Sequence, residues 1–206
     1  MTYTVSLMAW ASFFLAIASY ICGSIAILSG SSQPSVISRF FWLVLSVTNF
    51  LSYLSLGAGS GIFLSLANGL GSAIIFILSI KHGYIEFKRA DFVAIGGASI
   101  ALMCYLLINI KLVALVAGLL THFISGLPTY KRTWQNPHSE NLAFWVLFAL
   151  ASFISFTGVL IQHKNMIYPL YFFLFDAAMA LLIFCKRKQL EGLVTNPHAI
   201  AGVALD

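Results

Sequence analysis

Long apolar runs alternate with short polar connections along most of the chain. Each run is close to the ~20 residues that an α-helix needs to cross the roughly 30 Å hydrocarbon core of a membrane. The seven runs cover residues 5–28, 40–58, 62–80, 92–109, 112–130, 143–161 and 167–185. The connections carry Gly, Ser, Asn and Pro and leave no room for a soluble domain. The pattern predicts an all-α membrane protein with seven transmembrane helices.

Composition supports a membrane location. Hydrophobic residues make up 60% of the chain and charged residues 8%, against about 25% charged residues in a soluble domain. Residues 1–4 contain no Lys or Arg, and the apolar run that follows is longer than the core of a signal peptide. We therefore expect the first run to be a retained span. The lipid bilayer is the expected partner, and no nucleic acid is needed to explain the net charge of +5, because the basic residues flank the spans.

The distribution of Lys and Arg predicts the orientation, since the cytoplasmic side of a membrane protein collects them. With seven alternating spans, only Lys111 and Lys164 lie on one side. Nine basic residues lie on the other: Arg39, Lys81, Lys88, Arg89, Lys131, Arg132, Lys186, Arg187 and Lys188. The bias predicts an N-terminus outside and a C-terminus in the cytoplasm. Without any N-glycosylation acceptor, the chain suits a bacterial inner (plasma) membrane.

One stretch of the chain occurs twice, at a constant offset of 103 residues. The matching positions are Pro34 and Pro137, Phe41-Trp42 and Phe144-Trp145, Phe50 and Phe153, and Ser52 and Ser155. Residues 62–81 also run beside 167–186 after a two-residue insertion. The repeat predicts two parallel three-helix bundles related by an axis along the membrane normal. Trp42 and Trp145 begin equivalent helices, where we expect them to lie at the membrane interface.

The repeat divides the chain into four parts. The first bundle covers 1–83, the fourth helix and its loops form a linker over 84–111, the second bundle covers 112–188, and 189–206 is a cytoplasmic tail. The fourth helix has no counterpart. It returns the chain to the outer side, so that both bundles have the same orientation.

The end of the fifth span carries a local match to a known family. Pro128 precedes a basic loop, a serine and the next span, in the order Pro128, Lys131, Arg132, Thr133, Ser139 and Phe144-Trp145. This order resembles the PQ-loop superfamily, which includes SWEET sugar transporters, PnuC vitamin transporters, lysosomal amino-acid exporters and KDEL receptors. Asn68 and Gly71 are similar to the Asn-x-x-Gly arrangement of SWEETs, whereas Thr129 replaces the family's Gln. The resemblance implies a three-plus-one-plus-three fold.

Two ionisable side chains lie deep inside predicted spans. Asp176 is the tenth residue of the seventh span and His122 the eleventh of the fifth. Both spans run inward, so the two side chains lie at nearly the same depth. An ionisable residue at the centre of a span costs about 2.5 to 3.5 kcal/mol on insertion scales and marks a functional site. We expect Asp176 to bind the solute or to carry a proton. His122 either shares this role or is a neutral, hydrogen-bonded residue of the core.

Polar residues on the other spans converge on the same depth. The predicted solute-binding set is Asn49, Asn68, His122, Ser152 and Asp176. Small and hydroxyl residues also join helices in membrane bundles, which is the alternative interpretation of the serines and amides. Pro128 removes a backbone hydrogen bond near the end of its helix and is the predicted hinge.

These features predict a transporter that moves a small polar solute by alternating access. A sugar, vitamin, nucleoside or amino acid fits the set. Transport is coupled to protons through Asp176 and His122, or Asp176 binds the solute in a facilitator. The alternative function is a non-transporting receptor or sorting protein on the same fold. The sequence leaves open whether the protein forms a homo-oligomer.

We expect no enzyme activity, no cofactor and no metal. A metal-dependent hydrolase within the membrane needs several convergent His, Asp or Cys ligands, and Asp176 with His122 is too small a set. The cysteines Cys22, Cys104 and Cys185 all lie in apolar segments without the spacing of metal ligands. They are best interpreted as small packing residues.

Overall fold

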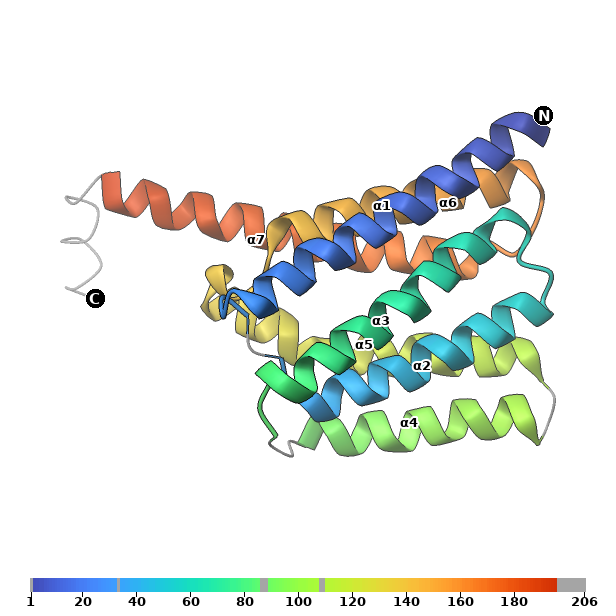
Figure 1. The fold of residues 1–206 in the computed structure, drawn as a ribbon, viewed down its shortest axis with the longest axis horizontal. Helices are drawn as coiled ribbons and strands as arrows, with labels where there is room; N and C mark the ends of the chain where they lie inside the picture. The colour runs from blue at the N-terminus through green and yellow to red at the C-terminus, as the bar shows by residue number, and fades with distance from the viewer. Residues whose placement is uncertain (1, 33, 86–88, 108–109, 196–206) are drawn as a thin grey trace, which may run out of the picture.

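The computed structural model of the chain describes residues 2–32, 34–85, 89–107 and 110–195. Within these ranges the chain forms helices, with one isolated backbone bridge between Ser35 and Tyr84 and no strand (Figure 1). The long helices are α1 (Thr2–Leu28), α2 (Val36–Ser55), α3 (Ile62–His82), α4 (Arg89–Leu106), α5 (Lys111–Gln135), α6 (Leu142–Ile161) and α7 (Ile167–Thr195). Short 3₁₀ turns, η1 (Gly59–Gly61) and η2 (Pro137–Ser139), precede α3 and α6. Lys88 and most of the predicted tail, 196–206, lie outside the described residues.

Six helices of the described chain are long and apolar enough to cross a membrane. They are α1, α2, α3, α5, α6 and α7. In the fourth predicted span, 92–109, the apolar helix is shorter and covers Ile95–Leu106. The helix α4 as a whole begins at Arg89 and ends at Leu106. The fold is thus that of an all-α membrane protein with six long apolar helices and one shorter one.

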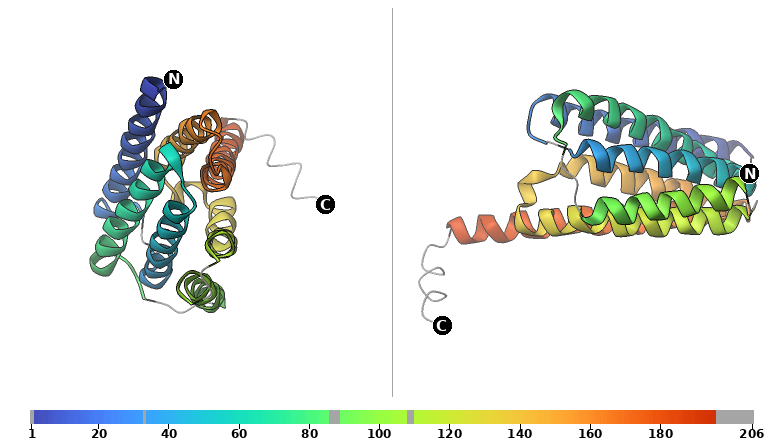
Figure 2. Two further views of the ribbon diagram at one scale, coloured as in Figure 1. Left: turned by 90° about the vertical axis from the view of Figure 1, so that its right-hand side faces the viewer. Right: turned by 90° about the horizontal axis from the view of Figure 1, so that it is seen from below.

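The helices pack in a regular order (Figure 2). In the first half α3 lies between α1 and α2, and in the second half α7 lies between α5 and α6. The halves meet where α1 packs on α6 and where α2 packs on α5. The helix α4 lies at the edge, against α5 and α2. A core of aromatic rings fills the space between the halves, including Tyr20, Tyr53, Phe148, Tyr168 and Phe172.

Charged side chains gather at one end of the bundle. The N-terminus and the connections α2–α3 and α6–α7 lie at one end, whereas the connections α1–α2 and α5–α6 lie at the other (Figure 1). The second end holds Lys81 in the last turn of α3, Arg132 in the last turn of α5 and the projecting part of α7. Lys111 and Lys164 belong to the first end. The separation of basic residues that the sequence predicts is thus present in the described part of the fold.

Side-chain caps position the two duplicated Phe-Trp pairs. The helix α2 begins after Ser35, whose hydroxyl accepts a hydrogen bond from the Ser38 amide at 3.4 Å. The helix α6 begins after Asn141, whose side chain accepts from the Phe144 amide at 3.2 Å. Such caps satisfy amide groups that have no partner within the helix. Each Phe-Trp pair therefore lies in the first two turns of a capped helix, at the basic end of the bundle.

Arg187 fastens the end of α7 to the connection between α5 and α6. Its Nε donates to the Pro137 carbonyl oxygen at 3.2 Å, and its Nη2 donates to the Glu140 carbonyl oxygen at 2.8 Å. Hydrogen bonds from charged groups stabilise by about 1.5 to 3 kcal/mol when buried, and water reduces this for a half-buried side chain. We expect Arg187→Gln to lower the free energy of unfolding by about 1 kcal/mol. Thermal unfolding in detergent measures the effect, with Lys131→Gln, an exposed residue at the same end, as control. Equal midpoints for the two variants would contradict this role.

Candidate functional site

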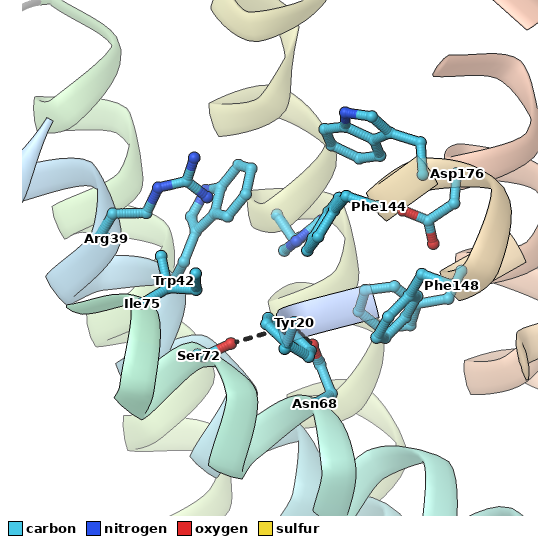
Figure 3. Close-up of a pocket in the computed structure, with 12 residues that line it drawn as sticks. Tyr20, Arg39, Trp42, Asn68, Ser72, Ile75, Phe144, Phe148 and Asp176 are labelled. Atoms are coloured by element: carbon cyan, nitrogen blue, oxygen red, sulfur yellow. Dashed lines mark hydrogen bonds between the residues drawn. The ribbon is translucent and has the colours of Figure 1, made fainter. Parts of the chain in front are cut away.

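A cavity lies between the two halves, and every helix except α4 contributes to its wall (Figure 3). The lining residues are Tyr20, Arg39, Trp42, Asn68, Ser72, Ile75, His122, Phe144, Trp145, Phe148, Phe172 and Asp176. The space open to the centre of a water molecule is about 30 Å³, which is room for about two waters. This space is too small for a molecule the size of a sugar or an amino acid.

A second cavity adjoins the first toward the basic end of the bundle. It is lined by α1, the start of α2 and the connection before α6, including Gly23, Glu140 and Asn141. The two cavities share four lining residues: Arg39, Ile75, Phe144 and Trp145. These four side chains therefore separate the central cavity from the basic end.

Two stacked tyrosines close the opposite end. The rings of Tyr53 and Tyr168 lie 5.0 Å apart at an interplanar angle of 19°, and both side chains are fully buried. The Tyr53 hydroxyl donates to the Asn165 carbonyl oxygen at 2.6 Å. A Cβ atom on Gly61 would lie 2.4 Å from the Tyr53 hydroxyl oxygen, so only glycine leaves room for this arrangement. The Tyr168 hydroxyl accepts a hydrogen bond from Asn68 in the cavity wall, so the stack packs next to the cavity.

Removing the Tyr53 hydroxyl is expected to loosen this closure. Tyr53→Phe deletes the bond to the Asn165 carbonyl group and is expected to lower the free energy of unfolding by about 1 kcal/mol. Hydrogen exchange of the backbone amides that follow Asn165 should become faster. The control is Tyr3→Phe, because Tyr3 is 92% exposed. Unchanged exchange in Tyr53→Phe would show that the hydroxyl does not hold the closure.

The amide of Asn68 is fully engaged within the protein. Its Oδ1 accepts from the Tyr20 hydroxyl at 2.5 Å, and its Nδ2 donates to the Tyr168 hydroxyl at 2.8 Å and to Ser46 at 3.4 Å. Ser72 completes the network with contacts to Ser46 at 3.0 Å and to Tyr20 at 3.4 Å. Asn68 thus lines the cavity while its hydrogen bonds join α1, α2, α3 and α7.

Asp176 differs from Asn68 in its hydrogen bonding. The residue is 4% exposed and lines the cavity, yet its Oδ2 atom has no hydrogen-bond partner among the described residues. An unpaired polar group away from water is costly, and a charged one is more so. Asp176 is therefore a group in the cavity wall with free bonding capacity.

His122 lines the same cavity but bonds elsewhere. Its Nδ1 lies 2.8 Å from the Tyr171 hydroxyl, and its ring lies 4.8 Å from the Trp42 ring. The structure brings His122 and Asp176 to one cavity, as their equal depth predicts. Among the described contacts, Tyr171 rather than Asp176 is the hydrogen-bond partner of the imidazole.

The other predicted solute-binding residues lie away from this cavity. Asn49 is buried against α5, where a Cβ on Gly118 would lie 2.1 Å from its Oδ1. Ser152 is fully buried in α6, and its hydroxyl has no partner in the described structure. Neither residue lines the cavity. Pro128 lies inside α5, which continues as a helix to Gln135, and its role as a hinge stays a prediction.

Both tryptophans, which lie near the starts of α2 and α6, line the cavity, and their depth at the membrane interface stays a prediction. Trp145 is 3% exposed and donates to Glu140 Oε2 at 3.3 Å. Trp42 donates to Ser125 Oγ at 3.1 Å. Both rings line the cavity: Trp42 packs against α5 of the other half, and Trp145 packs against α7 of its own half. Sequence reasoning also missed Tyr20, whose position opposite Gly71 depends on tertiary packing.

Charged groups line the cavities on the basic side. The Arg39 guanidinium carbon lies 4.7 Å from the centroid of the Trp42 ring, a distance at which the π-system attracts a cation. Glu140 lies outside the spans and lines the second cavity. Burial raises the pKa of its carboxyl group, whereas nearby Arg39 and the hydrogen bond from Trp145 act in the other direction.

The described residues contain no group of three or more His, Cys, Asp or Glu side chains that would hold a metal ion. Cys22, Cys104 and Cys185 are free thiols. Comparison of the chain with protein-family models, with curated proteins and with solved structures found no match. The functional argument therefore depends on the geometry of the chain itself.

Proposed function

We propose that the protein is a membrane transporter that carries a small polar solute by alternating access between two three-helix bundles. The observation that carries the proposal is the free carboxylate oxygen of Asp176 in a cavity formed by both halves. A buried carboxylate oxygen without a hydrogen-bond partner is costly, and ionisable groups inside membrane spans commonly serve a solute or a proton.

The packing order supports two related bundles of the PQ-loop kind. In each half the third helix lies between the first and the second. Across the halves, α1 packs on α6 and α5 packs on α2, which is the pattern that a two-fold axis along the membrane normal produces. Trp42 and Trp145, which match in the repeat, both line the cavity on this axis.

The basic end of the bundle is placed in the cytoplasm on the positive-inside rule, which leaves the N-terminus outside a bacterial inner membrane. On this placement, the Tyr53–Tyr168 stack closes the external side. The second cavity leads toward the cytoplasm. The conformation is then an occluded state whose cytoplasmic wall is Arg39, Ile75, Phe144 and Trp145, with Pro128 on α5 as the hinge.

Asp176 is also the proposed site of proton coupling. The titratable groups that interact with Asp176 or share its cavity are Tyr20 on α1, Arg39 on α2, His122 and Tyr130 on α5, and Tyr168 and Tyr171 on α7. If transport is coupled, Asp176 exchanges its proton as the cavity changes sides. If the protein is a facilitator, the carboxylate contacts the solute directly.

The experiment uses purified full-length protein. A thermal-shift screen against a metabolite library identifies a stabilising solute, and proteoliposomes then measure its uptake with and without a pH gradient. We expect saturable uptake, and stimulation by the gradient in the coupled case. Binding without uptake would overturn the proposal and support a receptor or sorting protein.

A further inference from the structure

The polar groups of the central cavity differ in their capacity to bind a solute. The uncharged groups are engaged: Asn68 bonds to Tyr20, Tyr168 and Ser46, and Ser72 bonds to Ser46 and Tyr20. His122 is engaged with Tyr171. A site that reads the hydroxyl groups of a sugar needs free amide and hydroxyl partners, because specificity comes from unpaired polar groups that the correct solute satisfies. This cavity holds few such groups.

Two charged side chains also line this cavity. Asp176 has an oxygen without a partner and is more than nine-tenths buried. Arg39 lines the same cavity from α2, with its guanidinium over the Trp42 ring. In Figure 3 the two side chains lie on opposite sides of the cavity. Asp176 on α7 and Arg39 on α2 thus line one space from the two halves of the fold.

Aromatic rings form the wall between these two charges. They belong to Tyr20, Trp42, Phe144, Trp145, Phe148 and Phe172. Aromatic faces attract cations by about 0.5 to 2 kcal/mol and cover apolar groups well. A wall of this kind suits a solute with an ammonium group and an apolar body.

From these observations we infer that the solute is a small zwitterion. Its ammonium group binds the carboxylate of Asp176, its anionic group binds the guanidinium of Arg39, and its body lies between the aromatic rings. This inference rests on the proposed transport function and names the chemical class of its solute. The two ends of such a solute would then face the two charged side chains of the cavity wall.

Calorimetric titration of the full-length protein in detergent tests the inference without requiring transport. The probes are the standard L-amino acids, and for each binder the matched amine that lacks the carboxylate and the matched acid that lacks the amine. Glucose and a neutral riboside represent the uncharged solutes. We expect at least one amino acid to bind. Each of its two matched analogues should bind with an affinity that is lower by a factor of about ten or more.

Variants assign the two ends of the solute. Asp176→Asn is expected to weaken binding of the amino acid by about thirtyfold and of its amine analogue similarly, but to leave the acid analogue unaffected. Arg39→Gln is expected to weaken binding of the amino acid and of its acid analogue, but to leave the amine analogue unaffected. Arg39→Lys is expected to restore part of the lost affinity. Ser152→Ala is the matched control, because Ser152 is buried but does not line the cavity. Thermal unfolding of each variant checks that it is folded.

The outcomes separate this inference from the proposed function. Binding of glucose or the riboside with no binding of any amino acid would overturn the zwitterion. Unchanged amino-acid affinity in folded Asp176→Asn would overturn it as well. Uptake of an uncharged solute by proteoliposomes would support the proposed transport function and contradict the inference that the solute is a zwitterion. Binding of an amino acid without uptake would keep the ligand class and reject transport.

Discussion

Replacing Asp176 with Asn is expected to abolish solute uptake without destabilising the protein. The substitution keeps the shape of the side chain and removes its charge. Loss of one partner of a buried charged contact costs at least about 2 kcal/mol, or roughly thirtyfold in binding. The Oδ2 atom of Asp176 has no hydrogen bond within the described structure, so the fold loses little. Uptake in proteoliposomes and thermal unfolding in detergent measure the two effects together.

The combination of effects makes this test specific. Substitution of a residue that serves folding lowers both the stability and the activity of the protein. Substitution of a residue that serves only the solute lowers the activity alone. The control is again Ser152→Ala, which is expected to retain both solute uptake and thermal stability. Unchanged pH-dependent uptake in Asp176→Asn would reject proton coupling through this carboxylate. A large fall in the unfolding midpoint would instead assign Asp176 to the fold.

Gly71→Ala is expected to destabilise the protein by about 1 to 3 kcal/mol, the cost of overpacking a core. A Cβ atom at Gly71 would lie 2.0 Å from the ring of Tyr20. The ring is buried and bonded through its hydroxyl to Asn68 and Ser72, so it cannot move without breaking the network. We expect the variant to lose solute binding as well, because Tyr20 lines the cavity.

Gly69 on the same helix supplies the control. A Cβ atom there meets nothing within 4 Å, and alanine has a higher helix propensity than glycine. Gly69→Ala is therefore expected to be neutral or stabilising. Thermal unfolding of the two variants side by side measures the difference. Equal midpoints would contradict the tight contact between Gly71 and Tyr20.

Gly71 and Asp176 occupy matching positions in the proposed repeat. In the first half the glycine lets the Tyr20 ring approach α3. In the second half the aspartate places its carboxylate on the cavity wall. On the proposed two-fold arrangement, one half supplies a packed aromatic wall and the other supplies the charge. A solute with two different ends suits such an asymmetric cavity.

The hydropathy pattern determined the all-helical membrane class and the approximate limits of the helices, because the need to bury backbone groups in lipid leaves few alternatives. It also predicted which connections share an end, since successive spans alternate. The costly ionisable residues Asp176 and His122 could be selected for the same reason. Both line the central cavity of the fold.

Only the tertiary structure decided which side chains face that cavity. Asn49 and Asn68 look alike in the sequence, yet Asn49 packs on Gly118 while Asn68 lines the cavity. Trp42 and Trp145 looked like interfacial residues, and the fold shows that both line the cavity. Within a membrane, lipid is as apolar as a helix surface, so hydropathy does not tell the lipid-facing side from the packed side. The rotation of each helix is decided by close packing, at positions such as Gly71 against Tyr20.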